Sequence, residues 1–375
     1  MEMKKVNILA GSLGLIIILI ALTFLGSCSS SPPAASTSPK ATAAASTSAA
    51  AINPIVLKYA PASLQPSPIL GQTLTVTEQL KLLEARANGK IKMDIYWSET
   101  LAKATDLTSA ISSGLTDMTH LRPYGEPGKL PLSTIGEMPG ISDDLWALSW
   151  AYWDLIRQEP LSTELAKYKA RPIWILFTQQ VQIISKAPIR TLGDLKGKKV
   201  AAGGIAAEEL KSLGSVPLSM APIEQSQGLL QGTIDAIAAP IDAMYSFKFY
   251  ESGKYVTNFA LGPRIQPVVI NQDTWNKLPA DVQKTFTDSV PDMINLAYTT
   301  IIKDTNEAVL KELANSKVEI IELSAADKAE VQKIRAAYGD QWADGQEKAG
   351  LPGKKVLADY RTLAAKYEQT SPYKK

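Results

Sequence analysis

The sequence is poor in the residues that metal sites and covalent mechanisms most often need. Its 375 residues include one cysteine and one histidine, which excludes structural zinc, a disulfide framework, iron–sulfur or c-type haem ligation and most histidine-based catalysis. No Gly-x-Ser-x-Gly elbow is present, so a secreted hydrolase is disfavoured. Lys+Arg 39 against Asp+Glu 37 leaves no basic excess for nucleic acid. The composition favours a binding protein without a metal or cofactor over an enzyme.

Residues 1–27 have the pattern of a secretory signal peptide. Lys4 and Lys5 precede a nearly uninterrupted apolar run from Val6 to Leu25, and small residues follow. The segment Leu25-Gly26-Ser27-Cys28 resembles a bacterial lipobox, in which Cys28 is acylated and becomes the mature N-terminus. A plain membrane anchor is the alternative, since about 20 apolar residues can span a bilayer. Both interpretations place the remaining chain outside the cytoplasmic membrane, in the periplasm or on the outer surface.

Residues 28–53 read as a tether. The stretch from Ser29 to Ala51 is built almost wholly from Ser, Ala, Pro and Thr, and Lys40 is its only charged residue. A segment with so little to bury cannot offset the entropy that ordering costs. We therefore expect it to link the membrane to a folded body.

Short apolar runs alternate with amphipathic ones in the body, which predicts βαβ units and a mainly parallel sheet. Strands are expected over residues 55–59, 91–97, 118–121, 173–177, 200–202, 216–219 and 236–239, and helices over 74–86, 104–113, 206–213 and 225–231. After Asn271 the chain becomes chiefly helical. One long helix is expected from 280 to about 314, kinked or divided at Pro291, before a strand at 318–322 and helices through 366.

One step of the chain occurs twice. Gly114 stops a helix and Asp117 leads into a strand, and Gly232 and Asp235 repeat this arrangement. Glycine can adopt the left-handed helix cap that such a step needs. The repetition indicates two similar lobes.

Three stretches, taken in order, resemble the solute-binding proteins of tripartite ATP-independent periplasmic (TRAP) transporters, the DctP-like family. They are residues 189–200 (IRTLGDLKGKKV), 216–224 with 230–236 (VPLSMAPIE and LQGTIDA), and 268–279 (VVINQDTWNKLP). The resemblance implies a two-lobed α/β periplasmic-binding-protein fold with crossing strands and a long connecting helix. Lobe I would hold residues 54–178 with 267–306, and lobe II would hold 179–266 with 307–375 and the C-terminal helices.

The resemblance also implies ligand positions, and this chain departs from the family at three of them. Ala201 stands where the family has an arginine that pairs with a ligand carboxylate, and Gln180 stands near the place of a second arginine. Ala239 replaces an asparagine. These departures predict a non-standard ligand site, for a neutral, aromatic or amphipathic compound or for an acid held by another arginine, Arg122.

Further candidate contacts lie near the ends of predicted strands, in the strand-like stretch around residue 180, or, for Tyr245, on a predicted helix. They are Trp97, His120, Arg122, Tyr124, Gln182, Gly203 and Tyr245. Each has a structural alternative: a surface arginine, a packed histidine, an edge strand for the glutamines near 180, and core packing for the aromatics. Gly203-Gly204 lacks the lysine and Ser/Thr of a phosphate loop.

Trp146, Trp150 and Trp153 share one face of a predicted helix. Burial in the core and a dimer or partner surface are both compatible with this spacing.

The sequence therefore predicts an extracytoplasmic receptor that captures a small molecule between two lobes and delivers it to a TRAP-type permease. Its partners would be the ligand, the permease subunits and the membrane through a lipid anchor, without nucleic acid. A receptor that signals to a membrane sensor without transport is the alternative.

Overall fold

The computed structural model describes residues 53–61, 71–220, 222–300 and 306–373. The expected signal peptide, Cys28 and nearly all of the expected tether lie outside the described residues. Within the described ranges, no helix is both long enough and apolar enough to cross a membrane.

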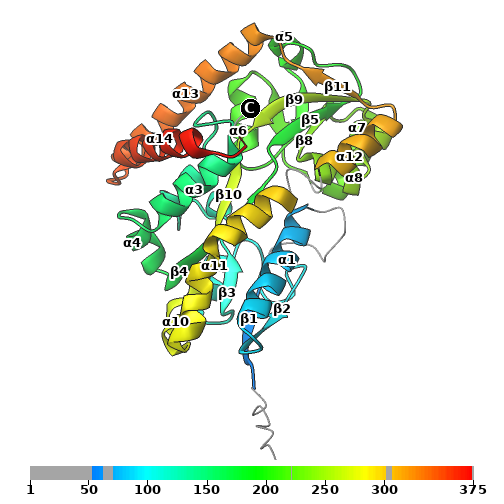
Figure 1. The fold of residues 1–375 in the computed structure, drawn as a ribbon. Coiled ribbons are helices and arrows are strands. Elements are labelled where there is room, and N and C mark those ends of the chain that lie inside the picture. The colour runs from blue at the N-terminus through cyan, green and yellow to red at the C-terminus, as the bar shows by residue number, and fades with distance from the viewer. Residues whose placement is uncertain (1–52, 62–70, 221, 301–305, 374–375) are drawn as a thin grey trace, which may run out of the picture. The chain divides into compact units, whose positions relative to one another are not determined.

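Five strands form the first sheet (Figure 1). In order across the sheet they are β2 (Ile91–Ile95), β1 (Ile55–Tyr59), β3 (Met118–His120), β10 (Arg264–Asn271) and β4 (Ala170–Thr178). β1 pairs in parallel with β2 and β3, whereas β10 is antiparallel to both β3 and β4.

Six strands form the second sheet. Their order is β11 (Glu319–Glu322), β9 (Tyr255–Leu261), β5 (Val181–Ser185), β8 (Ala236–Ala239), β6 (Lys199–Ala201) and β7 (Val216–Leu218). β6 is parallel to β7 and β8, and β11 is parallel to β9, but β5 is antiparallel to β8 and β9. Among the described strand pairs, five are parallel and four are antiparallel, so the expected mainly parallel arrangement holds by a small margin. Each antiparallel pair includes β5 or β10, the strands that enter a sheet directly from the other sheet.

The chain passes directly from one sheet to the other at two places. Gln179 and Gln180 connect β4 to β5, and Gly262 and Pro263 connect β9 to β10. These adjacent connections lie close to the boundaries expected at 178/179 and 266/267.

Helices cover both faces of each sheet. Around the first sheet lie α1 (Gly71–Arg86), α2 (Leu107–Ser113), α3 (Leu145–Ile156), α4 (Leu161–Ala166), α10 (Gln272–Lys277) and α11 (Ala280–Tyr298). Around the second lie α5 (Leu192–Leu195), α6 (Ile205–Ser212), α7 (Pro222–Gln231), α8 (Ile241–Ser246), α9 (Phe249–Ser252), α12 (Asn306–Asn315) and the N-terminal part of α13 (Ala325–Lys348). Two short 3₁₀ helices, η1 (Pro123–Gly125) and η2 (Ser133–Glu137), follow β3.

The expected long helix differs in its bounds. α11 continues through Pro291 and ends at Tyr298, and α12 begins at Asn306. Pro291 therefore does not divide the helix, contrary to one of the two expectations for it.

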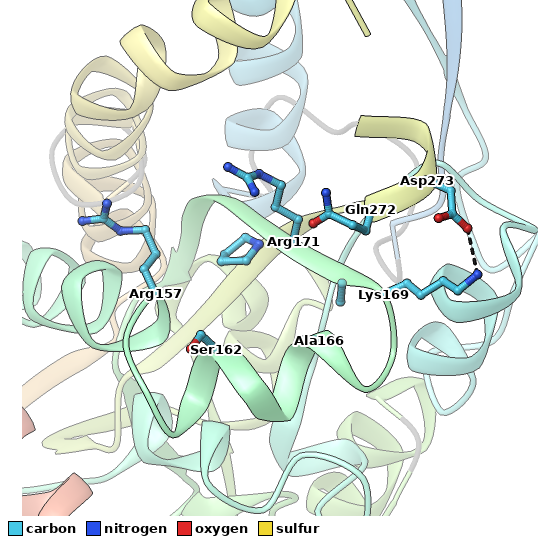
Figure 2. A pocket seen from close by; sticks show the side chains of 9 residues that line it. Arg157, Ser162, Ala166, Lys169, Arg171, Gln272 and Asp273 are labelled. Atoms are coloured by element: carbon cyan, nitrogen blue, oxygen red, sulfur yellow. Dashed lines mark hydrogen bonds and ion pairs between the residues drawn. The ribbon is translucent and has the colours of Figure 1, made fainter. Parts of the chain in front are cut away.

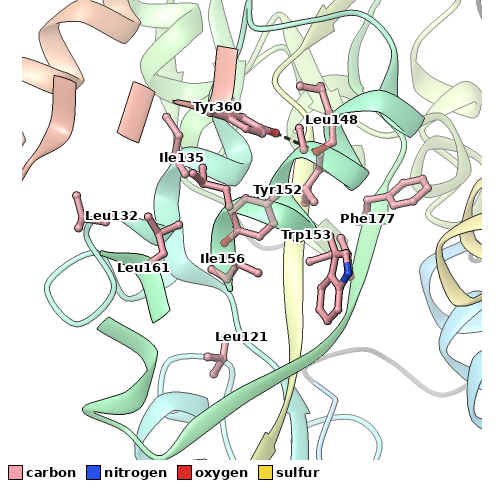
Figure 3. Close-up of a cluster of buried hydrophobic side chains, with 14 of the residues drawn as sticks. Leu121, Leu132, Ile135, Leu148, Tyr152, Trp153, Ile156, Leu161, Phe177 and Tyr360 are labelled. Carbon is pink, nitrogen blue, oxygen red and sulfur yellow. Dashed lines mark hydrogen bonds between the residues drawn. The ribbon is translucent and has the colours of Figure 1, made fainter. Parts of the chain in front are cut away.

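The last helix, α14 (Gly353–Thr370), packs on α3 and joins the core of the first sheet (Figure 3). Tyr360 meets Tyr152 edge to face at 6.3 Å between ring centroids, and both side chains are fully buried. This contact differs from the expected assignment of all of 307–375 to the second lobe. Sequence periodicity can identify an amphipathic helix but does not say which core it covers.

The tryptophan face of α3 lies beneath the same helix. Trp153 is buried, and Trp146 and Trp150 are half-buried against Tyr367 with ring centroids 6.2 Å and 5.9 Å away. Intramolecular packing thus accounts for this face.

The repeated glycine–aspartate step is confirmed as a structural repeat. Gly114 and Gly232 have φ angles of 74° and 78°. Asp117 Oδ2 accepts from the Lys58 amide at 2.9 Å, and Asp235 Oδ2 accepts from the Lys199 amide at 2.8 Å. Each aspartate ties the start of its strand to the neighbouring parallel strand, so the two sheets use the same local device.

Gly136 in η2 has no room for a side chain. A Cβ added there would lie 2.7 Å from the Ile265 carbonyl oxygen and 2.7 Å from Cε2 of Tyr152. We expect Gly136→Ala to lower the free energy of unfolding by about 1–3 kcal/mol, as overpacked core variants do. Gly128→Ala is the control, because nothing lies within 4 Å of that added Cβ. Equal urea-unfolding midpoints for the two variants would contradict this packing.

Candidate ligand site between the two sheets

Short segments that follow the carboxyl ends of strands in both sheets, including η1 and the first turn of α8, carry the candidate site. Arg122 and Tyr124 follow β3 in the first sheet, whereas Gly203 and Gly204 follow β6 and Asp242 follows β8 in the second. Ligands of open α/β sheets bind outside the carboxyl ends of their strands.

Two arginines and two carboxylates interact electrostatically at this place. Arg264 is the first residue of β10. The carboxylates of Glu137 and Asp242 raise the pKa of its guanidinium, and the charge of Arg122 lowers it. Glu137 is buried and accepts a hydrogen bond from Gln266 Nε2 at 3.4 Å. We call Arg122, Glu137, Asp242 and Arg264 the arginine cluster.

Burial disfavours the charged forms within the arginine cluster. It raises the pKa of Glu137, although Arg264, the bond from Gln266 and Arg122 all oppose that rise. Burial likewise lowers the pKa of Arg264, Glu137 raises it, and Arg122 lowers it again. Because the charge of Arg122 lowers the pKa of Arg264, a further anion beside the Arg264 guanidinium would stabilise its charged form.

Tyr124 reaches from the loop after β3 to the second sheet. A Cβ added to Gly204 would lie 3.4 Å from Tyr124 Cδ1, so the ring packs against this glycine. Gly204 has φ 63° and ψ −149°, a conformation that glycine adopts readily. Burial, Tyr338 and Glu208 raise the pKa of Tyr124, which also hydrogen-bonds with Tyr338.

His120 is packed beneath the cluster instead of facing a ligand. Its side chain is 1% exposed, and Nδ1 lies 3.2 Å from the Tyr59 hydroxyl. Burial, followed by the charge of Arg122, lowers the pKa of His120 to about 3. The structural interpretation of this histidine is therefore the better one.

Because His120 is the only histidine, NMR can follow its ring directly. We expect its Cε1–H signal to stay constant from pH 8 to pH 4.5, while the urea-unfolded chain titrates near pH 6.5. A folded-state pKa below the unfolded one means that this histidine favours folding above about pH 6.5 and that this contribution is lost as the pH falls toward about 3. A folded-state midpoint above pH 5 would contradict the buried placement.

Gln180 and Gln182 line a different region. They border a cavity of about 920 Å³ whose lining includes neither Arg122, Tyr124 nor Arg264. Gln182 is buried, and its Oε1 accepts a hydrogen bond from the Ala260 amide at 2.8 Å. Its side chain therefore stabilises the end of β9, just before the chain crosses to β10. The structure does not bring these amides together with Arg122.

The remaining expected residues have different surroundings. Ala201 and Ala239 are buried in a hydrophobic cluster of the second sheet, and Gly203 is exposed. Tyr245 stacks on Tyr250 with ring centroids 5.5 Å apart. Trp97 is partly buried and packs against a hydrophobic cluster of the first sheet. Of these residues, Gly203 lies next in sequence to Gly204, the glycine on which Tyr124 packs.

A buried ion pair holds the connection between β9 and β10. Arg335 Nε lies 2.5 Å from Glu209 Oε1, and both side chains are almost fully buried. Arg335 also donates to the carbonyls of Phe259 and Ala260 at 2.8 and 2.9 Å. Glu209 Oε2 accepts from the Gly262 amide at 3.2 Å. Side chains of α6 and α13 thereby fix the backbone where it leaves the second sheet.

A smaller cavity of about 380 Å³ lies at the end of β4 and β10 opposite Arg264 (Figure 2). Its bases have local partners: Arg157 pairs with Asp154 and Lys169 with Asp273, both at 2.8 Å. Arg171 lies over the Trp275 ring at 4.5 Å from its centroid. These cations are exposed, and no expected site residue lies among them.

Sequence reasoning missed Glu137, Glu209, Arg264 and Arg335. They come from a 3₁₀ helix, two α-helices and a crossing strand, and only the fold makes them neighbours. Charged residues inside apolar stretches, such as Arg264 between Leu261 and Ile265, were the available signal. Among the described residues, no group of three or more His, Cys, Asp or Glu side chains is placed to hold a metal ion.

Known proteins share this sequence pattern. The family described as bacterial extracellular solute-binding protein, family 7 (DctP), matches residues 67–345. The C4-dicarboxylate-binding periplasmic protein DctP of Rhodobacter capsulatus is 26% identical over 303 residues, covering 79% of this chain and 88% of the relative. The 2,3-diketo-L-gulonate-binding periplasmic protein YiaO of Escherichia coli is 27% identical over 250 residues, covering 64% and 74%.

Solved structures share the fold. A TRAP periplasmic solute-binding protein from Desulfovibrio salexigens, in an open complex, is 26% identical with a TM-score of 0.72, covering 86% of this chain and 99% of that one. A TRAP solute-binding protein from Rhodoferax ferrireducens, in complex with benzoate, is 21% identical with a TM-score of 0.74, covering 84% and 99%. The expected two-lobed α/β fold and the expected family are both confirmed.

Proposed function

The chain belongs to family 7 of the bacterial extracellular solute-binding proteins, and from this premise we propose that it binds an organic acid through Arg122 and Arg264. As a member of that family it is an extracytoplasmic receptor of a TRAP-type transport system, which captures a small molecule and delivers it to a membrane permease. The proposal concerns which residues hold the ligand and what class of ligand they hold.

The position of the arginine cluster carries the proposal. Arg122 follows a strand of the first sheet, Asp242 follows a strand of the second, and Arg264 opens the strand that crosses between them. A guanidinium group matches the two oxygens of a carboxylate, and a partly buried one gains most from such a partner. A molecule bound here would contact both sheets, so it would favour the closed arrangement of the lobes.

The positions at which the family resemblance places ligand contacts (180, 201 and 239) do not offer a positive charge for an acid in this chain. Ala201 and Ala239 are buried alanines that offer no charge, and Gln180 offers a neutral amide. A neutral ligand at these positions was the competing expectation. The burial of both alanines leaves little surface with which they could contact it, and this favours Arg122 and Arg264 instead.

The names of relatives agree with an acid as ligand. Proteins 26–27% identical to this chain are named for C4-dicarboxylate, 2,3-diketo-L-gulonate and sialic acid, and each of these compounds carries a carboxylate. We infer that the ligand here shares this group but is held by other side chains. The role is binding and closure without covalent change.

The lobes and the membrane attachment form part of the same proposal. Lobe I corresponds to the first sheet with α1 to α4, α10, α11 and α14, and lobe II to the second sheet with α5 to α9 and α12. Acylated Cys28 anchors the chain to the membrane, and residues 29–53 give the body room to reach the permease.

A thermal-shift screen tests the ligand class. The wild-type chain is heated with mono- and dicarboxylates, aromatic acids and sugar acids, each beside its uncharged amide. We expect one group of acids to raise Tm while the matching amides do not, because only a ligand of the native state stabilises it. Stabilisation by amides as strong as by acids would refute the proposal.

A further inference from the structure

The cavity of about 920 Å³ has walls from both sheets. The first sheet and its helices contribute Asp143, Asp144, Gln179 and Tyr298, and the C-terminal segment adds Glu368 and Tyr373. The second sheet and its helices contribute Phe259, Asn306, Glu322, Lys328 and Arg335 among others. Its size falls within the range of small-molecule sites, about 300–1,000 Å³. None of the four members of the arginine cluster lines this cavity.

Two buried oxygen atoms of this lining lack a hydrogen-bond donor in the described part of the chain: Asp144 Oδ2 and Asn306 Oδ1. Asp144 uses its other oxygen, Oδ1, to cap α3 by accepting from the Ala147 amide at 3.0 Å. Buried polar atoms nearly always have partners, and each exception calls for an explanation. Both of these atoms are acceptors, so a group that completes them must donate.

The charges of the lining residues also favour a ligand that donates hydrogen bonds and carries positive charge. Its two bases are already paired, Arg335 with Glu209 at 2.5 Å and Lys328 with Glu322 at 2.8 Å. Asp143 and Asp144 form no ion pair with any described residue. The unbalanced charge of the cavity is therefore negative.

An aromatic pair adjoins these carboxylates. The rings of Tyr298 and Tyr373 stack with centroids 3.8 Å apart and an interplanar angle of 22°. Burial, followed by the charges of Asp144 and Tyr373, raises the pKa of Tyr298. Aromatic faces beside carboxylates attract cations that carry a flat or apolar body.

We propose that this cavity binds an organic cation with several N–H donors, of the amidinium, guanidinium or ammonium class. The cation donates to Asp144 Oδ2 and to Asn306 Oδ1, and its apolar part packs on Tyr298 and Tyr373. This ligand is opposite in charge to the acid proposed for the arginine cluster, so the two sites are chemically separate.

Benzamidine and its uncharged analogue benzamide form a matched pair of probes for calorimetric titration of the wild-type chain. We expect benzamidine to bind and benzamide to bind at least tenfold more weakly, the loss typical of a missing charge-assisted hydrogen bond. Equal affinity for the two probes, or no binding of benzamidine at millimolar concentration, would overturn the proposal.

Three variants locate the site. Asp144→Asn keeps a side chain that can cap α3 but removes the charge, and should weaken benzamidine binding about tenfold. Asn306→Asp adds a carboxylate and should strengthen it, a gain that misfolding cannot imitate. Asp288→Asn removes an exposed acid paired with Lys284 outside the cavity and should change nothing. Unchanged affinity in the Asp144 and Asn306 variants would place the cation elsewhere and refute the assignment.

The acid site provides the final control. Arg122→Ala should leave the affinity for benzamidine unchanged, and the response to acids should be unaffected by Asp144→Asn. A failure of the cation site then leaves the acid-binding proposal standing, and the converse also holds. A loss of benzamidine binding in Arg122→Ala would contradict the separation of the two sites.

Discussion

Replacing Arg122 with alanine should weaken binding of the acid found in the thermal-shift screen by roughly 30- to 150-fold, because a lost charged hydrogen-bonding pair costs about 2–3 kcal/mol. Arg122 is half-buried beside Arg264 and Glu137. Without Arg122, the carboxylate has one guanidinium instead of two and shares that one with Glu137. Isothermal titration of the wild-type and variant chains measures the difference.

Two further variants separate geometry from charge. Arg122→Lys retains the positive charge but not the planar fork, so an intermediate loss of about tenfold is expected. Gln180→Ala alters a position at which the family resemblance places an arginine, but it lies outside the arginine cluster, and affinity should change less than threefold. If Gln180→Ala abolished acid binding while Arg122→Ala left it intact, the ligand would lie at the family positions instead.

Replacing Arg335 with alanine should lower the free energy of unfolding by about 3–5 kcal/mol, the cost of leaving a buried charge without its partner. Glu209 is 2% exposed, and burial already raises its pKa in spite of Arg335. The variant also deprives the Phe259 and Ala260 carbonyls of their donor. Urea unfolding at pH 7 measures the loss.

Two comparisons give this prediction its controls. Lys333→Ala breaks an exposed pair with Glu330 on the same helix and should cost less than about 1 kcal/mol. The Arg335→Met, Glu209→Met double variant removes both charges and should recover part of the stability lost in Arg335→Ala. A loss in Arg335→Ala no larger than that in Lys333→Ala would show that the ion pair does not hold the connection.

The pH dependence of Arg335→Ala has a defined sign. Without the arginine, the folded-state pKa of Glu209 lies still further above its unfolded value, so the folded state binds the proton more readily than the unfolded state does. The variant should therefore lose less stability at pH 5 than at pH 7. A loss that grows toward low pH would contradict the burial of Glu209.

This ion pair matters to function because of where it acts. Ala260 adopts φ 50°, a left-handed conformation that is uncommon for alanine. Its amide donates to Gln182 and its carbonyl accepts from Arg335. The connection between β9 and β10 is thus bonded to β5, next to the other connection, and to α13. A rotation of one sheet against the other would strain or break these hydrogen bonds.

Local pattern was a good guide to the individual elements of this fold. Alternating apolar positions located β8 at its observed bounds and α1 to within a few residues. Gly114 and Gly232 identified the repeated step, because a left-handed cap favours glycine strongly. These features depend on residues close together in the sequence.

The candidate site could not be assembled in the same way. Arg122 was identified because it follows a strand, but Glu137 and Arg264 reach it only when β10 crosses between the sheets. The resemblance directed attention to Ala201 and Ala239, which are buried. The docking of α14 on α3 likewise depends on shape complementarity between distant segments, which periodicity does not encode.

A crystal structure of the chain with the acid selected by the thermal-shift screen tests the central claim most directly. We predict density for a carboxylate between the guanidinium groups of Arg122 and Arg264, with Tyr124 and Gly204 enclosing the rest of the molecule from the two sheets. Density for the acid beside Gln180 and Gln182, with Arg122 and Arg264 making no contact to it, would contradict the account.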